Sequence, residues 1–380
     1  MNIRFLKAVS QIPSVQWNAV AGTDYPFLRH EFLSALELSG CVAPETGWQP
    51  HHLLIEDGGR LLAVMPLYVK QHSYGEFVFD HAWAEAYFQN GLAYYPKLLN
   101  AIPFTPCNGP RIAFSGISAS ALATLVSDAL QRETRRLGAS GWHCLFPGQA
   151  QSDIWNAMDA DRRIACHFHW FNNGYDGFEA FLQDCQPRKR KEIKRERRII
   201  AEQGIELKRI RGADILPEHI TRFHLFYQLT NAKYNGHGGY LSEAFFQMLL
   251  RDMPEQMLLV FAYQGGECIA GALYFFSSDT LFGRYWGCLQ DRDMLHFETC
   301  FYQGIDFCIE NGLSVFDPGA QGEHKIKRGF RPIITQSFHC LTHLQFRQAV
   351  QRFLAQEKQA VLHYQKEMTG LLPFKPEAGN

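Results

Sequence analysis

No long hydrophobic run occurs in this sequence: among its 380 residues, no window of about 18 residues or more is both apolar and free of charge. A membrane-spanning helix of the usual length is therefore excluded. The N-terminal segment MNIRFLKAVSQIPSV does not resemble a signal peptide either, because Arg4 and Lys7 interrupt its apolar stretch. We expect a cytoplasmic protein without a transmembrane segment.

Paired cysteines are also missing, since the ten cysteines are scattered and none belongs to a CxxC pair. Disulfide frameworks and zinc sites depend on such spacing, so reduced and buried thiols are the favoured interpretation. His167 and His169 would share one face of a strand, but no second ligand pair lies nearby. We expect these two side chains to pack rather than to bind a metal, and we expect no metal cofactor.

An excess of charge of either sign is absent as well. The 37 basic and 38 acidic side chains leave a net charge near −1, which excludes a strongly basic nucleic-acid coat but allows a local basic patch. Apolar side chains are abundant, at 46%, and 30 of them are phenylalanines. A chain of this length and composition is expected to form two or three domains with large cores.

Two stretches of the sequence, 51–80 and 257–287, share one pattern. Each contains a glycine pair, Gly58-Gly59 or Gly265-Gly266, between runs typical of strands. Because glycine accepts positive φ, such a pair predicts the tight turn of a β-hairpin. Each stretch is therefore predicted to form a three-stranded antiparallel meander. The predicted strands are His52–Glu56, Arg60–Lys70 and Gly75–Asp80, and then a strand ending at Tyr263, Cys268–Phe276 and Leu281–Trp286.

The surroundings of the two meanders match, which predicts two related domains unless the hairpins resemble each other by chance. A strand and two helices precede each meander, and a helix follows it. The predicted elements are 3–8, 13–20, 26–38 and 84–100 in the first half, and 205–210, 217–229, 242–251, 296–310 and 313–316 in the second. The fold class is α+β, with mixed sheets flanked by helices. The predicted boundaries are 1–170, a connector at 171–204, 205–343, and a helix and tail at 344–380.

The predicted connector carries most of the local positive charge. Pro187 suits a first helical position and Gly204 the position after a helix end, so a helix is predicted between them. Within Arg188–Arg198 there are eight basic and two acidic residues, so the helix is either a solvated connector or an anion-binding surface for the phosphates of a nucleotide, coenzyme or tRNA. The candidate anion-binding residues are Arg188, Lys189, Arg190, Lys191, Lys194 and Arg195.

A second polar cluster follows the predicted strand 313–316. The sequence Asp317-Pro318-Gly319 must turn, and the next residues combine acids, bases and glycines. A cluster of polar residues at the end of a strand favours a binding or catalytic site over a loop without such a role. The candidates are Glu323, His324 and Lys327 for catalysis, and Lys325 and Arg328 for substrate binding.

The predicted helix 296–310 places His296 and Glu298 in its first turn, beside Arg284 and Tyr285 of the preceding strand. Glu298 is either a general base or an ordinary glutamate stabilised by the helix dipole. The stretch 83–111 is either a ligand-facing loop or an ordinary structured one. Its candidate substrate-binding residues are Tyr95, Lys97 and Asn108.

Four stretches of the sequence together form a distinctive set of motifs: YYPKLLNAIPFTPCNGPR (94–111), GRYWGC (283–288), HFETCFYQGIDFCIENGL (296–313) and GAQGEHKIKRGFRP (319–332). In these motifs the chain resembles a bacterial family named for peptidoglycan biosynthesis or recognition. That family is similar to the Fem-type peptidoglycan aminoacyltransferases and belongs to the GNAT-like acyltransferase superfamily, which implies two tandem GNAT-like domains. Lys327-Arg328-Gly329-Phe330 resembles the Fem-type Lys-x-Gly-Phe element, in which a lysine faces the substrate cleft.

Two departures from the family pattern bear on the acyl donor. The chain has no room for a coiled-coil arm before the second meander, which weakens tRNA docking of that kind. The loop Leu289–Leu295 lacks the glycines that cradle pyrophosphate in acetyl-CoA-using relatives.

The resemblance implies an acyl- or aminoacyltransferase that forms an amide bond. The donor would be an acyl-CoA or an aminoacyl-tRNA, and the acceptor an amine of a small molecule or of a cell-wall precursor. The alternative is a non-catalytic binding protein on a degenerate transferase fold that recognises a cell-wall precursor or nucleic acid.

Overall fold

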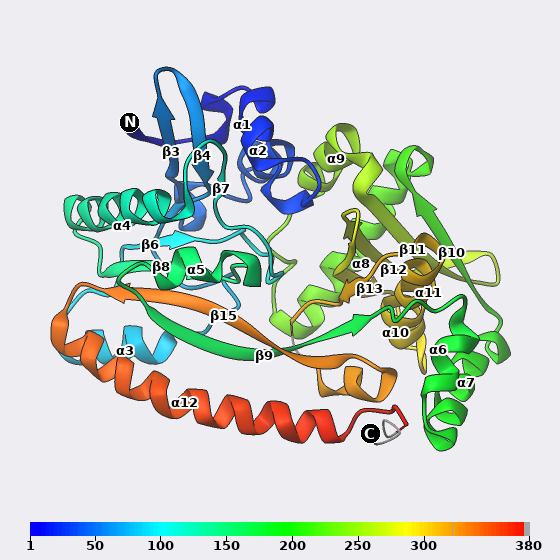
Figure 1. Ribbon diagram of the computed structural model, residues 1–380. Helices are drawn as coiled ribbons and strands as arrows, with labels where there is room; N and C mark the ends of the chain where they lie inside the picture. The colour runs from blue at the N-terminus through cyan, green and yellow to red at the C-terminus, as the bar shows by residue number, and fades with distance from the viewer. Residues whose placement is uncertain (321, 376–380) are drawn as a thin grey trace. The chain divides into compact units, whose positions relative to one another are not determined.

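The computed structural model describes residues 1–320 and 322–375, and the chain divides into two compact units (Figure 1). Unit 1 comprises Met1–Ala165 and Ile334–His363, and unit 2 comprises Cys166–Ile333 and the residues from Tyr364 onward. The chain crosses from one unit to the other within β9 (Asp161–Phe171), β15 (Arg331–Leu341) and α12 (Leu344–Gly370). Both units contain helices and mixed strands, which confirms the predicted α+β class.

Unit 1 contains two groups of paired strands. The first has the order β1 (Asn2–Leu6), β3 (His52–Asp57), β4 (Arg60–Met65) and β7 (Ala113–Phe114), all antiparallel. The second runs from β15 through β8 (Gly141–Leu145), β6 (Lys97–Asn100) and β5 (Tyr68–Lys70) to β2 (Trp48–Pro50). Within it, β6 and β8 are parallel.

Besides the first part of α12, unit 1 contains the helices α1 (Ser14–Ala21), α2 (His30–Leu38), α3 (His81–Gln89), α4 (Ala119–Arg136) and α5 (Ser152–Asn156). Helix α4 begins where Ser118 Oγ accepts a hydrogen bond from Ala121 N, a side-chain cap that satisfies a free backbone donor. Leu122, Val126 and Leu130 follow at helical spacing and join the buried core of the unit.

Unit 2 is built on one mixed set of strands. Its order is β10 (Ile205–Arg211), β11 (Met257–Gln264), β12 (Glu267–Phe276), β13 (Thr280–Cys288), β14 (Val315–Asp317) and β9. All neighbours are antiparallel except β13 and β14, which are parallel. This parallel pair positions the candidate site described below.

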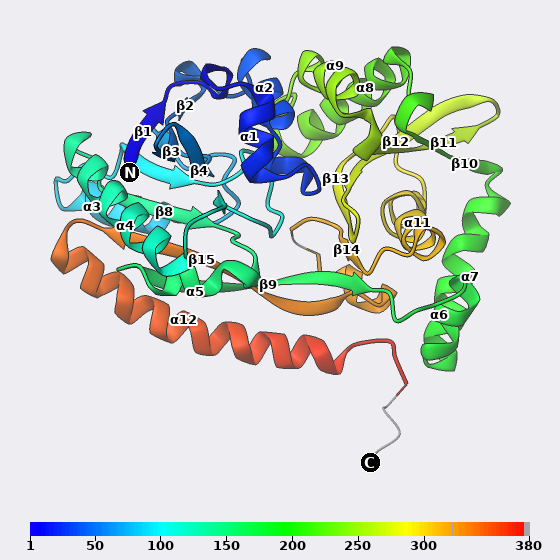
Figure 2. The same cartoon turned by 45° about the horizontal axis from the view of Figure 1, so that its top comes forward.

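Helices cover both faces of these strands. Figures 1 and 2 show α8 (Pro217–Asn235) and α11 (Gln303–Asn311) on opposite sides of β11–β13. On the α11 side, Val260, Tyr274 and Ile305 belong to one buried apolar cluster. The remaining helices are α6 (Phe178–Asp184), α7 (Pro187–Glu202), α9 (Glu243–Asp252) and α10 (Leu295–Phe297). In the part of the chain that the structure describes, no helix has the length and apolarity needed to cross a membrane.

Both predicted glycine turns are confirmed. Gly58 and Gly59 have φ of 53° and 82°, and Gly265 and Gly266 have φ of 59° and 86°. Asp57 pairs with Arg60, and Gln264 with Glu267, so each glycine pair forms a two-residue hairpin loop. In each half the preceding strand, β1 or β10, lies antiparallel to the first hairpin strand.

Other sequence predictions were wrong in unit 1. The predicted strand Gly75–Asp80 is irregular, because Phe77 leaves the extended backbone range with a φ of 61°, and Glu76 and Asp80 bind a buried lysine. The predicted helix 84–100 is instead α3, which ends at Gln89, and β6. The structure also divides the chain differently from the predicted boundaries, since the basic connector belongs to unit 2 and β15 contributes to both units.

Candidate functional site

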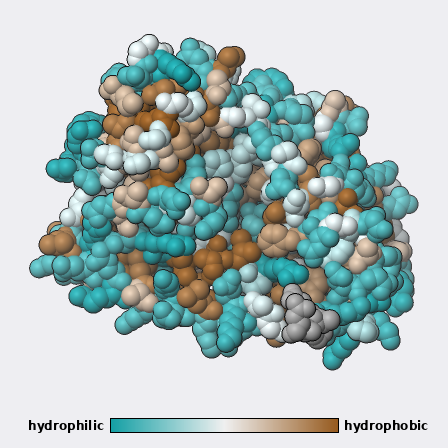
Figure 3. All heavy atoms as spheres, in the orientation of Figure 1, coloured by the Kyte–Doolittle hydropathy of each residue, from teal (hydrophilic) through white to brown (hydrophobic). Residues whose placement is uncertain are grey.

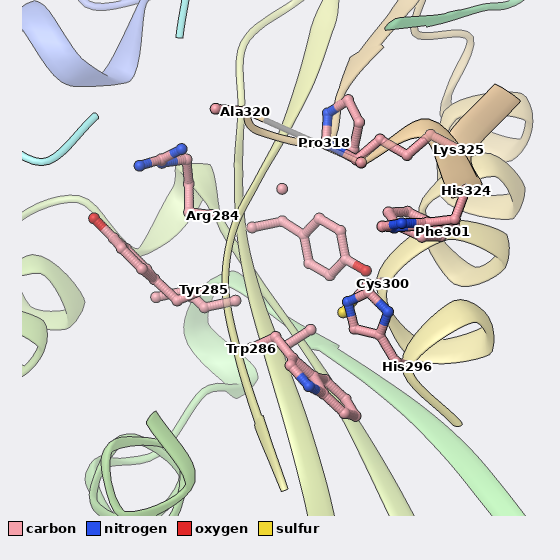
Figure 4. Close-up of a pocket in the computed structure, with 15 residues that line it drawn as sticks. Arg284, Tyr285, Trp286, His296, Cys300, Phe301, Pro318, Ala320, His324 and Lys325 are labelled. Carbon is pink, nitrogen blue, oxygen red and sulfur yellow. The ribbon is translucent and has the colours of Figure 1, made fainter. Parts of the chain in front are cut away.

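A cavity of about 390 Å³ lies in unit 2, where strand pairing on one side of β13 stops. β13 pairs with β14 only from Thr280 to Phe282 and then continues to Cys288. Figure 4 shows Arg284, Tyr285 and Trp286 on the strand side of the cavity, with His296, His324 and Lys325 on the other side. The further lining residues are Ala272, Leu273, Tyr274, Gly283, Cys300, Phe301, Pro318, Ala320 and Gly322.

The helical wall of the cavity is not a regular α-helix. The chain enters α10 through Met294, whose φ is 60°, and a π-helical turn at Glu298–Tyr302 separates α10 from α11. Such widened turns are rare and occur frequently at functional sites. The turn carries Cys300 and Phe301 at the cavity, and its Thr299 carbonyl accepts a hydrogen bond from the Tyr274 hydroxyl. The sequence predicted an uninterrupted helix over this range.

Beside this helical wall lie the turn after β14 and the following 3₁₀ helix, Glu323–Arg328. Gly319 has a φ of 84°, in the left-handed region that favours glycine. The Gly319 carbonyl accepts a hydrogen bond from Lys325 Nζ at 2.7 Å, and Lys325 is only 3% exposed. The lysine ammonium is therefore held at a defined position in the wall.

Two imidazoles meet at the cavity. The ring centroids of His296 and His324 are 6.0 Å apart, and both rings contact the ring of Phe301. Burial, reinforced by nearby positive charge, lowers the pKa of His296 to about 4. Burial, with the Lys325 and Arg328 cations, likewise lowers the pKa of His324 to about 4. Both imidazoles are therefore neutral near pH 7 and able to accept a proton.

Apolar and aromatic groups complete the lining. The Trp286 and His296 rings lie 5.4 Å apart, and the Arg284 guanidinium lies 5.1 Å from the Tyr285 ring. Burial raises the pKa of the Cys300 thiol, so this cysteine is not a ready nucleophile. The cavity thus combines two neutral bases and two cations with aromatic walls.

The structure brings five of the predicted site residues together. His296, His324, Lys325, Arg284 and Tyr285 all line this cavity. These five residues belong to three separate segments of the chain, which meet where the pairing of β13 with β14 ends.

Glu298 is placed differently. Its side chain is buried at 4% exposure and lies outside the cavity lining. Its carboxylate binds Arg197 at 3.0 Å and Gln303 at 2.8 Å. Arg197 also binds Asp306 at 2.7 Å, so this cluster fastens α7 to the helix that carries the cavity wall.

The other candidates after β14 also lie outside the lining. The Glu323 carboxylate accepts a hydrogen bond from the Tyr364 hydroxyl at 2.8 Å, and Lys327 is exposed. Arg328 is buried, binds Glu196 at 2.8 Å and lies over the Phe297 ring at 3.3 Å. Arg328 also donates a hydrogen bond to the His324 carbonyl at 2.7 Å, which fixes the backbone of that histidine.

The basic helix α7 is largely solvated, and the visible face over it is hydrophilic in Figure 3. Several of its cations have partners: Arg188 and Lys189 approach Glu192, and Lys194 binds Glu179 at 2.8 Å. Arg190 donates to the carbonyls of Leu182, Gln183 and Cys185. Lys191 and Arg195 are exposed. Exposed pairs of this kind are weak, so the surface remains cationic.

The candidates in the first half belong to unit 1. Lys97 is fully buried, and its ammonium binds Glu76 at 2.8 Å, Asp80 at 2.5 Å and Ser73 at 2.8 Å. The Tyr95 hydroxyl contacts Ser73 Oγ at 2.9 Å, and Asn108 is half-buried. The lysine is thus the centre of an internal charge cluster.

Sequence reasoning did not select Trp286, Cys300 or Asp317. Trp286 and Cys300 line the cavity, and Asp317 lies buried directly behind it. The Asp-Pro-Gly turn was a visible signal for Asp317, whereas Cys300 reaches the cavity in a π-helical turn that no sequence pattern marked.

Several solved structures share the fold of this chain. FemX matches with a TM-score of 0.54 at 11% identity, over 92% of this chain and 100% of that chain. A conserved protein of unknown function from Bacteroides thetaiotaomicron VPI-5482 matches at 0.52 and 11% identity, over 90% and 100%. The C-terminal domain of a putative lysylphosphatidylglycerol synthetase from Agrobacterium fabrum matches at 0.54 and 8% identity, over 89% and 94%. At these identities the likeness establishes the fold.

The family follows from a match over nearly the whole chain. Residues 8–376 match the FemAB-like family, which is described as peptidoglycan biosynthesis/recognition. The chain belongs to this family. Among curated proteins, no sequence matches it.

Proposed function

We propose that this protein is an N-acyltransferase or aminoacyltransferase that forms an amide bond at the cavity beside β13. One observation carries the proposal: two neutral imidazoles and a held lysine ammonium line a single cavity with aromatic walls. Membership of the FemAB-like family supports the reaction class. Membership of this family also favours a peptidoglycan precursor as the molecule that carries the acceptor amine.

In this reaction the amine nitrogen attacks the carbonyl carbon of an activated acyl group. The new N–C bond forms, the bond from carbon to the leaving group breaks, and the attacking nitrogen loses a proton. His324 is the proposed acceptor of that proton, because its ring is neutral and lies at the exposed side of the wall. Lys325 stabilises the negative charge that develops on the carbonyl oxygen, and the proton leaves with the departing group.

The choice of donor depends on the loop that follows β13. Asp291 and Asp293 are exposed there, and Asp291 pairs with Lys233. This loop lacks the glycines whose backbone amides cradle a pyrophosphate, so the proposal favours an aminoacyl-tRNA donor over an acyl-CoA. The exposed cations of α7 would attract the tRNA backbone.

The test is a product assay on the full-length chain. Purified protein is incubated with aminoacyl-tRNAs or acyl-CoAs and with amines that include a cell-wall precursor peptide, and amide products are detected by mass spectrometry. We expect a product that is lost in Lys325→Met and reduced at least about 100-fold in His324→Gln. As the matched control, Lys327→Met removes an exposed lysine two residues away and should leave the rate within about twofold.

A second candidate is a binding protein without catalysis. The glycine-free loop after β13 and the engagement of Glu298 with Arg197 favour this alternative, because both remove elements expected of a transferase. A ligand that raises the melting temperature, yet never yields product with any amine, supports binding alone.

A further inference from the structure

Behind the cavity wall, the carboxylate of Asp317 is buried at the end of β14, with 1% of the residue exposed. Its Oδ1 accepts a hydrogen bond from Gly319 N at 2.9 Å, and its Oδ2 lies 3.5 Å from His169 Nε2 on β9. Burial alone would raise the pKa of Asp317, but His169, the Gly319 N–H and His167 together lower it. The carboxylate is therefore ionised in the folded protein, and its contacts offset the cost of burial.

Gly319 connects this carboxylate to the cavity. Its N–H binds Asp317, and its carbonyl accepts the ammonium of Lys325 at 2.7 Å. The positive φ of Gly319, together with a Gly283 carbonyl only 3.3 Å from where a Cβ would lie, makes glycine the residue that fits. The N–H of Gly319 is thus hydrogen-bonded to a buried acid, and its carbonyl is hydrogen-bonded to a lysine that lines the cavity.

We propose that Asp317 is a positioning residue that, through the Gly319 turn, sets the place of the Lys325 ammonium in the cavity. Asp317 does not line the cavity, so it acts through the lysine rather than on a ligand. The chemical use of that ammonium rests on the proposed function, but the positioning itself does not, because all of its contacts lie within the protein.

The experiment measures the pKa of His324 by NMR, using histidine labelled in the imidazole ring and a His324→Gln sample for assignment. Lys325 is one of the cations that hold this pKa low. Lys325→Met should therefore raise it, by about 0.5 or more. If Asp317 positions the lysine, Asp317→Ala should raise the pKa in the same direction, although removing a negative charge would by itself lower it.

Two further variants distinguish an effect of the Gly319 turn from a general disturbance of the structure. Asp317→Asn removes the charge but keeps an oxygen that accepts from Gly319 N, so it should not raise the His324 pKa. Adding Asp317→Ala to Lys325→Met should give no further rise, because the route through the lysine is already removed. If Asp317→Ala does not fold, Gly319→Ala disturbs the same turn and is judged by the same criterion.

The proposal is overturned if Lys325→Met raises the His324 pKa but Asp317→Ala does not. It is also overturned if Asp317→Ala still raises that pKa in the Lys325→Met background. Since this measurement needs no substrate, its failure is distinct from failure of the proposed transferase reaction, which would appear as absence of product in the wild-type protein.

Discussion

The charge cluster around Lys97 in unit 1 allows a sharp test of whether this lysine is structural or binds substrate. The perturbation is Lys97→Met, which keeps most of the side-chain volume and removes the ammonium. In the folded protein that ammonium is fully buried and binds both Glu76 and Asp80. The variant would leave the buried Asp80 carboxylate without its lysine and Glu76 with only Lys70, which lies 4.0 Å away.

The expected magnitude follows from the burial of this cluster. Removing one partner of a buried ion pair costs about 3–5 kcal/mol. A loss of that size is a large fraction of the roughly 5–15 kcal/mol that stabilises a typical domain. The ion pair with Lys97 and its hydrogen bond hold the pKa of Asp80 below its ordinary value, although burial alone would raise it. Ionised Asp80 thus stabilises the wild-type fold at every pH above the ordinary carboxyl pKa of about 4. Without the Lys97 cation, burial raises the pKa of Asp80, so the variant takes up a proton as the pH falls, and the difference between variant and wild type should be smaller near pH 4.5 than near pH 7.5.

The assay is urea unfolding followed by circular dichroism, combined with hydrogen exchange of the peptide that contains β6. The double variant Asp80→Asn, Lys97→Met removes one charge of each sign and leaves Glu76 paired with Lys70 at 4.0 Å, so it should recover at least half of the loss. A loss below about 1 kcal/mol at pH 7.5 would refute the reasoning. If stability is retained while product formation falls, Lys97 instead has the substrate-binding role that the sequence predicted.

Three further outcomes are expected. Cys300→Ala should keep product formation within about threefold of the wild type. Cys300 in the folded protein should also react slowly with iodoacetamide, because burial raises the pKa of its thiol. Loss of activity in this variant would instead indicate that the thiol takes part in the reaction. The stability advantage of the wild type over His324→Gln should fall as the pH drops from 6.5 toward 4, because the unfolded imidazole of His324 binds a proton that the folded one does not; an advantage that stays constant over this range would contradict the low pKa of His324. Arg197→Met should destabilise the protein by about 2–4 kcal/mol in urea unfolding, since it unpairs Glu298 and Asp306; a variant of full stability that lacks activity would instead support a catalytic Glu298.

Features encoded over a few residues could be predicted from the sequence. The glycine pairs at Gly58-Gly59 and Gly265-Gly266 determined the hairpin turns, because positive φ is a local requirement. The polar cluster after β14 similarly pointed to His324 and Lys325, which lie within a few residues of a turn. Such signals need no knowledge of the rest of the fold.

Features that depend on distant partners could not be predicted. Glu298 looked like a candidate base in its own helix, but its partner Arg197 lies 101 positions away in the sequence. The stretch Gly75–Asp80 alternates like a strand, yet Glu76 and Asp80 both bind the buried Lys97. The π-helical turn that brings Cys300 to the cavity likewise has no sequence signature.

The central claim is that the cavity beside β13 holds the reacting groups. The most direct measurement is a crystal structure of the full-length protein with the donor that gives the largest thermal shift. The account predicts density for the acyl group between Tyr285 and His324, with its carbonyl oxygen within hydrogen-bond distance of Lys325 Nζ. Density for the acyl group elsewhere, with this cavity unchanged, would contradict it.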